Sequence, residues 1–199
     1  MRKVIMMAAV LTASPVTPSW AQWRLGLGVG RDVYSGVSQG TFEDGGASFK
    51  PYHPLVWAFR AELPRSQPRL SIDLRYSTPD IALVGAEITL IPHGSFLEML
   101  AVAPTAGWTL FDLSPGVTIE GEAGPVIERW RVEDVDDRTL LGVGGGLALR
   151  IELGGRLAAR LSARLGMTPT SPLSGALIEG YATRAAWRRG LEGSVLLRL

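Results

Sequence analysis

The residues with the most direct chemical potential are His93 and Ser95, in the stretch "IPHGS". A histidine that takes the proton of a serine hydroxyl creates a nucleophile for acyl transfer, provided that a carboxylate orients the imidazole. No recognisable motif beside "IPHGS" supplies that carboxylate. Proline, glycine and serine are also ordinary turn residues. We therefore interpret this stretch as a turn, and we predict no catalytic residue and no enzyme activity.

Two further stretches could in principle bind a ligand. Glu133, Asp134, Asp136 and Asp137 carry the oxygen ligands that divalent cations prefer, but an acidic run is more simply explained as a solvated loop. The glycines at 142–146 resemble a nucleotide-binding fingerprint only superficially, because no helix is expected after them. We predict neither a metal ion nor a cofactor.

The first residues of the chain are typical of a secretory signal peptide. Arg2 and Lys3 precede an apolar run, and Ser19, Trp20 and Ala21 resemble a cleavage site, so we expect residues 1–21 to be removed and residues 22–199 to form one domain. The chain has 20 basic and 19 acidic residues, which gives no basic excess for nucleic acid. It has no cysteine, which excludes disulfides and CxxC metal or redox sites.

The stretch "RLAARLSARLGM", residues 156–167, fits two kinds of element. On a helix its leucines and arginines form two stripes, as in an amphipathic helix on a membrane surface. On a strand the same residues alternate, with Leu161 on one face and Arg160 and Arg164 on the other. Gly154 and Gly155 precede this stretch, and a Gly-Gly link between two alternating runs indicates a β-hairpin. This link favours the strand.

Similar alternation extends along the whole mature chain, which predicts an all-β protein. We count about ten segments and keep eight as the alternative, reached if the pair around Pro104 merges or lies outside the membrane. The segments are residues 23–31, 54–63, 69–77, 81–91, 96–103, 108–113, 116–130, 139–153, 156–167 and 189–199. The links between them are short or long, and the long ones are residues 31–53, 131–138 and 168–188.

Three features together favour a closed, antiparallel, up-and-down transmembrane β-barrel over a soluble sandwich. The first is the alternation of link lengths. The second is the set of charges on the polar face, which a narrow barrel must pair inside its lumen: Arg60, Glu62, Asp73, Arg75, Glu87, Glu120, Glu122, Arg150, Glu152, Arg160 and Arg164. The third is the set of aromatic residues near strand ends, expected at the two membrane interfaces: Trp23, Tyr76, Trp108, Trp130 and Trp187.

In these features the chain resembles small bacterial outer-membrane β-barrel proteins of the OmpA-like or OmpX-like kind. The resemblance covers nearly all of the mature chain and lies in its pattern, without a diagnostic motif. It implies a location in the outer membrane, with lipid and lipopolysaccharide as partners and the barrel assembly machinery acting on the last strand. Such proteins usually end on Phe or Trp, whereas this chain ends on Leu199.

We expect a non-enzymatic outer-membrane protein with a lumen filled by side chains, acting through its extracellular loops or through envelope integrity. One alternative is a narrow pore or transporter for small solutes. Another is an exported soluble β-barrel that binds an apolar ligand, in which the face assigned here to lipid would be the core.

Overall fold

A computed structural model describes residues 23–43, 46–63, 68–77, 81–84, 87–90, 97–132, 135–170, 172 and 185–199. The predicted signal peptide, His93, Ser95, Glu133 and Asp134 lie outside these residues. Within the described part of the chain, no helix is long and apolar enough to cross a membrane.

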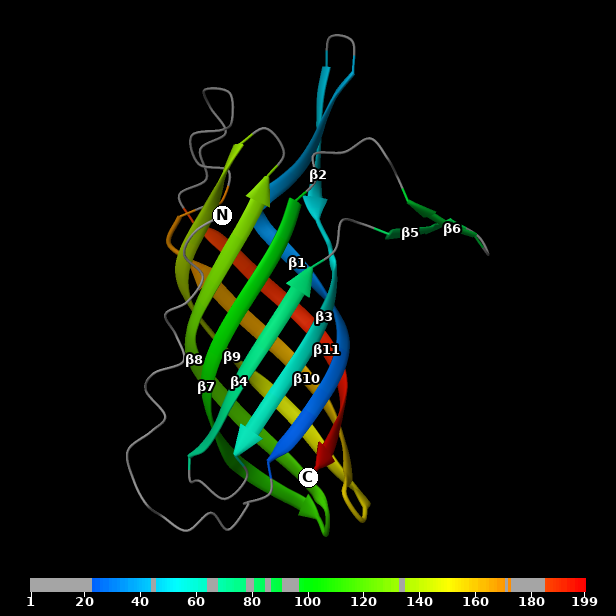
Figure 1. The fold of residues 1–199 in the computed structure, drawn as a ribbon, viewed down its shortest axis with the longest axis vertical. Coiled ribbons are helices and arrows are strands. Elements are labelled where there is room, and N and C mark those ends of the chain that lie inside the picture. The colour runs from blue at the N-terminus through cyan, green and yellow to red at the C-terminus, as the bar shows by residue number, and fades with distance from the viewer. Residues whose placement is uncertain are drawn as a thin grey trace, which may run out of the picture.

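Eight tilted antiparallel strands form a closed barrel (Figure 1). They are β1 (Arg24–Glu43), β3 (Leu55–Leu63), β4 (Arg69–Ser77), β7 (Leu97–Ser114), β8 (Val117–Val132), β9 (Val135–Gly154), β10 (Leu157–Thr168) and β11 (Ala186–Arg198). Each strand pairs with the next in chain order, and β1 pairs with β11, from Arg24 opposite Arg198 to Ser35 opposite Trp187. This pairing closes the sheet and confirms the predicted closed barrel.

The barrel has the eight strands of the alternative count, and two local features explain the difference from ten. The segments around Pro104 are one strand, β7, in which Pro104 pairs with Ile72 of β4 while the pairing with β8 is interrupted between Val102 and Ala106. A proline has no N–H to donate, and here the strand tolerates that gap in one ladder without ending. The segment 81–91 contributes β5 (Ile81–Val84) and β6 (Glu87–Leu90), which form a separate two-stranded sheet.

Because the number of strands is even, the start of β1 and the end of β11 lie at the same end of the barrel, here called the terminal end. The opposite end is called the loop end. Two of the predicted long loops contain more strand than expected. β1 continues to Glu43 and pairs there with β2 (Gly46–Tyr52), so residues 31–53 are mostly extended. β8 and β9 leave only residues 133–134 between them, so 131–138 is not a long loop.

Strand alternation decides which side chains face outward. In β10 the exposed residues Leu157, Leu161 and Leu165 alternate with the buried arginines 160 and 164, as the strand interpretation predicted. The turn before β10 is tight because Gly154 and Gly155 adopt φ values of 98° and 58°, a conformation that other residues rarely adopt. The apolar face lies outside and the charged face inside, so the interior is not the apolar core or ligand cavity of a soluble barrel.

Candidate functional site

The centre of the barrel interior holds two carboxylates that share arginines from different strands. Glu122 of β8 accepts from Arg60 of β3 at 2.8 Å and from Arg160 of β10 at 2.7 Å, and it lies 3.3 Å from Arg164 Nη2. Asp73 of β4 accepts from Arg60 and Arg164, each at 3.1 Å. These five residues, here called the central cluster, are all at least nine-tenths buried. Arg60 and Asp73 lie opposite each other on the neighbouring strands β3 and β4. The other ion pairs of the cluster connect strands that are not neighbours in the sheet, so they cross the lumen.

A second group of ion pairs lies toward the terminal end. Arg150 of β9 donates to Glu62 at 2.6 Å and lies 3.2 Å from Glu120 through its Nε. Arg69 also pairs with Glu120, and its other guanidinium nitrogen donates to Thr109 at 2.9 Å. This second level therefore contains paired charges of both signs.

A third group lies toward the loop end. Arg75 donates to both carboxylate oxygens of Asp32, at 3.1 and 3.2 Å, and its Nε lies 3.3 Å from Glu192. Arg188 donates to Glu128 at 2.8 Å. Arginine suits such sites because its planar guanidinium can bind a carboxylate through two nitrogens.

An aromatic cluster covers this third level on the loop side. Tyr34 and Trp130 pack edge to face with ring centroids 5.3 Å apart, and Met99 lies against the Tyr34 hydroxyl. The Trp130 indole donates to Glu128 at 3.0 Å, which ties the cluster to the ion pairs below it. The described interior therefore holds three levels of charged side chains and one aromatic level.

Glycines provide the room that these large side chains need. A side chain at Gly166 would meet the Arg188 guanidinium at 3.1 Å, and one at Gly190 would collide with the Asp32 carboxylate. The glycines that face the lumen on β10 and β11 are therefore explained by crowding around the Arg188 and Asp32 side chains.

The structure places most of the residues expected in the lumen inside the barrel, but not all. Those that are buried there are Arg60, Glu62, Asp73, Arg75, Glu120, Glu122, Arg150, Arg160 and Arg164. Glu152 lies at the terminal rim, where its half-exposed side chain pairs with Arg24 at 2.9 Å. Glu87 lies in β6, which belongs to a separate two-stranded sheet and not to the barrel sheet that was expected to contain it. Its local alternation could not reveal that its segment leaves the barrel.

Sequence reasoning missed four buried interior charges, Asp32, Glu128, Arg188 and Glu192, and the half-buried Arg69. Asp32 and Arg188 fell in segments assigned to loops. Their signal was present, because Asp32 follows Gly28 and Gly30 at the spacing of one strand face. Trp130 is separated from Glu122 and Glu128 by an even number of residues, so the three side chains share one face of β8. Trp130 is fully buried, which corrects its assignment to the membrane interface, whereas Trp23, Tyr76, Trp108 and Trp187 are outward and exposed.

The described interior contains no group of three or more residues suited to holding a metal ion. Its paired charges connect distant strands across the lumen. The fold and this interior define the class: a small, closed, eight-stranded antiparallel β-barrel with an apolar outer wall and a charged interior.

Among solved structures, the chain is similar to Neisserial surface protein A, with 11% identity, a TM-score of 0.62, and coverage of 89% of this chain and 97% of that one. Ail from Yersinia pestis matches with 10% identity, a TM-score of 0.49, and coverage of 90% and 99%. The N-terminal β-barrel domain of Pseudomonas aeruginosa OprF matches with 11% identity, a TM-score of 0.37, and coverage of 85% and 97%. No protein-family description and no curated protein matches the sequence. At these identities the likeness concerns the fold.

Proposed function

We propose that this chain is a non-enzymatic protein of the bacterial outer membrane whose barrel is closed to ions, and whose function lies in its loop end or in envelope integrity. The observation that carries the proposal is the inverted distribution of side chains. Leucines and aromatics cover the outside, while arginines and carboxylates are buried and paired inside. Water would not favour this arrangement, whereas a bilayer requires it.

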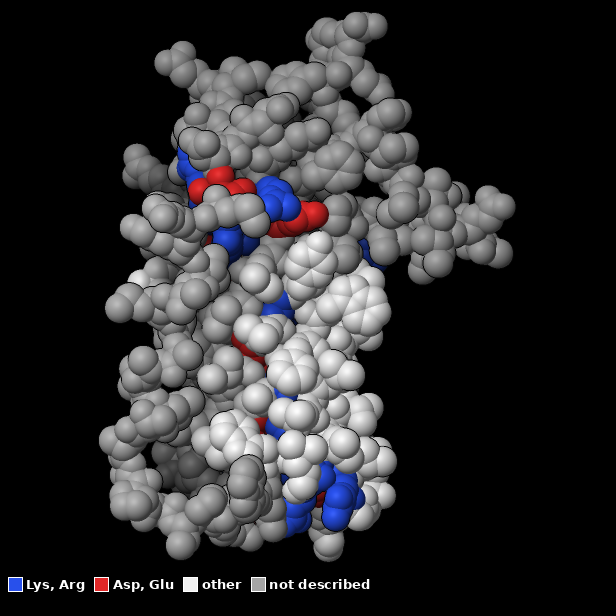
Figure 2. Space-filling view, viewed as in Figure 1, with Lys and Arg blue, Asp and Glu red and all other residues white. Residues whose placement is uncertain are grey.

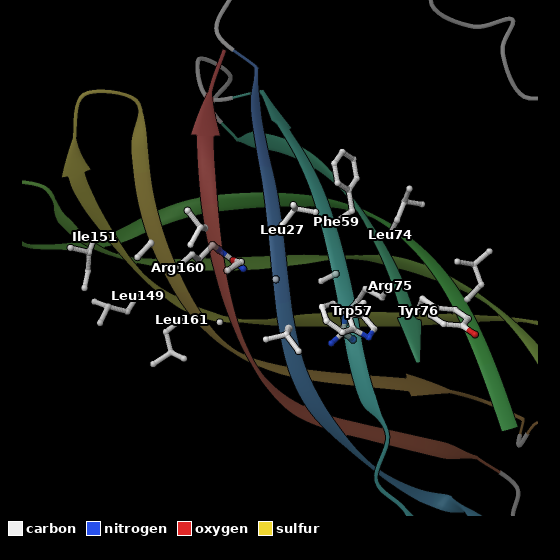
Figure 3. A pocket seen from close by; sticks show the side chains of 18 residues that line it. Leu27, Trp57, Phe59, Leu74, Arg75, Tyr76, Leu149, Ile151, Arg160 and Leu161 are labelled. Carbon is white, nitrogen blue, oxygen red and sulfur yellow. The ribbon is translucent and has the colours of Figure 1, made fainter. Parts of the chain in front are cut away.

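The outer wall supports insertion into a membrane. A continuous apolar belt runs over β9, β10, β11, β1, β3, β4 and β7, and Figure 3 shows Leu149, Leu161, Leu27, Phe59 and Leu74 along it. On the face in Figure 2, charged side chains gather near both ends, with mostly uncharged surface between them. A closed sheet leaves no unpaired strand edge in that belt, as a hydrocarbon environment demands.

We also propose how the barrel is oriented in the membrane and which strand the assembly machinery recognises. The terminal end faces the periplasm, as the even strand number of bacterial barrels requires, and the loop end faces the outside. The last strand closes the barrel and keeps the outward apolar residues Val195, Leu197 and Leu199. We expect the assembly machinery to recognise this strand, although it ends on leucine. Lipid and lipopolysaccharide would surround the barrel.

The test combines vesicle flotation with planar-bilayer recording on the mature chain, residues 22–199. We expect the refolded protein to float with vesicles and to produce no discrete current steps, while a general porin in the same bilayer conducts. Recovery in the aqueous fraction without detergent would contradict the membrane location. Stepwise conductance by the folded protein would instead favour the alternative of a narrow pore.

A further inference from the structure

Two arginines lie on the outer wall of the barrel, whereas most of its strand arginines point into the lumen. Arg31 of β1 and Arg189 of β11 are exposed on the outer wall, on the same face as Leu27 and Leu191. The register pairs Arg31 with Leu191 and Val33 with Arg189, so the two arginines are diagonal neighbours. Diagonal positions are roughly 7–8 Å apart, within reach of long side chains. Both guanidiniums could therefore contact one ligand.

These two arginines differ from the other outward arginines near the loop end. Arg129 pairs with Asp137 at 2.7 Å, and Arg131 pairs with Glu98 at 3.5 Å. Arg31 and Arg189 have no acidic partner among the described residues, and the outer faces of β10, β11 and residues 24–35 of β1 carry no acidic residue. Their charge is thus available to an anion from outside the chain.

The position of the pair corresponds to a membrane interface. Trp187 is two residues before Arg189 on the same outward face, and it is 57% exposed. Aromatic residues of outer-membrane barrels gather at the interface, and an arginine costs little there although it is costly at the bilayer midplane. Leu191 follows Arg189 toward the terminal end, and Leu165 lies directly opposite Arg189 on β10, so the apolar belt begins beside the pair.

An apolar groove adjoins the pair. It has a volume of about 600 Å³ and crosses β9, β10, β11 and β1, with Arg31 and Arg189 in its lining beside Val33, Leu147, Ala163 and Leu165. Ala163 lies opposite Leu147 of β9 and Leu191 of β11. Because its side chain is small, it leaves a depression between these two larger side chains. A groove of this kind fits an alkyl chain, and the adjoining guanidiniums fit a phosphate.

We propose that Arg31 and Arg189 bind the phosphate of a lipid in the outer leaflet, with an acyl chain of that lipid lying in the groove. This inference rests on the proposed membrane location. The charge of the pair and the apolar lining select an anionic amphiphile over a free anion, because each part of the site matches one part of such a molecule.

The test is native mass spectrometry of the refolded mature protein in detergent, titrated with phosphatidylglycerol, with diacylglycerol of the same acyl chains, and with inorganic phosphate. We expect one phosphatidylglycerol to be retained, little diacylglycerol, and no displacement by millimolar phosphate. The variant Arg31→Gln/Arg189→Gln should lose roughly twenty-five-fold in apparent affinity, since each arginine near an anionic lipid contributes about a factor of five.

The matched control is Arg129→Gln/Arg131→Gln, which removes the same charge from arginines that already have partners. It should bind phosphatidylglycerol like the unchanged protein. Equal losses in both double variants, or equal retention of diacylglycerol, would overturn the site. Displacement by inorganic phosphate would reduce it to an adventitious anion site only. Vesicle flotation of each variant separates these results from a failure of membrane insertion, which would contradict the proposed function.

Discussion

At the scale of single residues, the interior depends on a few shared carboxylates. Glu122 lies within 3.3 Å of nitrogens from three arginines, and its side chain is 3% exposed. Burying charges is costly, and removing one partner leaves the others uncompensated. The loss of Glu122 should therefore be far more damaging than the loss of an exposed partner.

We predict that Glu122→Gln lowers the free energy of unfolding by about 3–5 kcal/mol, the range for breaking a buried ion pair. Urea unfolding from lipid vesicles, followed by tryptophan fluorescence, measures this change. The control is Arg129→Gln, which removes an ion pair whose arginine is 61% exposed and should cost less than about 1 kcal/mol. Similar losses in the two variants would contradict a closed, desolvated network.

A double variant tests the coupling inside the central cluster. Arg160 donates to Glu122 through Nη2, while its Nε and Nη1 have no hydrogen-bond partner. Glu122→Gln/Arg160→Met should consequently lose less stability than the sum of the two single variants, because the second change removes the orphaned charge.

At the scale of elements, the β9–β10 hairpin depends on backbone conformation and not on packing. Gly154 and Gly155 have positive φ, and a side chain at either would meet nothing within 4 Å. There is space for a side chain at both positions, so the backbone conformation alone limits which residue types the turn accepts.

We predict that Gly155→Asn is nearly neutral, because asparagine tolerates the left-handed conformation, whereas Gly155→Val costs about 1–2 kcal/mol. The midpoint of urea unfolding from vesicles reports the difference. Gly193→Val is the matched control: the site is also open within 4 Å, but its φ is not in the left-handed region. A valine at 155 that is as stable as asparagine would show that the turn can rearrange.

At the scale of the whole molecule, eight strands give the barrel two chemically different ends. The β7–β8 and β9–β10 turns, at residues 115–116 and 155–156, lie at the terminal end, while the connection from β10 to β11 leaves from the loop end. The proposed orientation thus makes these two places experimentally distinguishable.

We expect an epitope tag inserted between residues 175 and 176 to be labelled by antibody on intact cells, because the β10–β11 connection would face outward. The same tag inserted between Gly154 and Gly155 should be labelled only after the outer membrane is permeabilised. Labelling of the second tag on intact cells would reverse the proposed orientation.

Much of this protein was determined by local sequence. Alternation has a period of two, so the neighbours of Leu161 and Arg160 specify which face each occupies, and the Gly-Gly pair specifies where the chain turns. The same rule identifies Trp130 as an inward residue within the predicted segment 116–130, and it identifies Asp32 once the first segment is extended past residue 31.

Only the tertiary structure decided which strands belong to the barrel and which charges meet. Glu87 alternates like its neighbours, yet its segment lies outside the barrel sheet, and Pro104 lies within a strand that continues past it. Arg164 meets Asp73 across 91 residues of sequence, and Arg150 meets Glu62 across 88. Such partners depend on barrel closure and strand stagger, which are properties of the whole sheet and leave no trace in the pattern of any one segment.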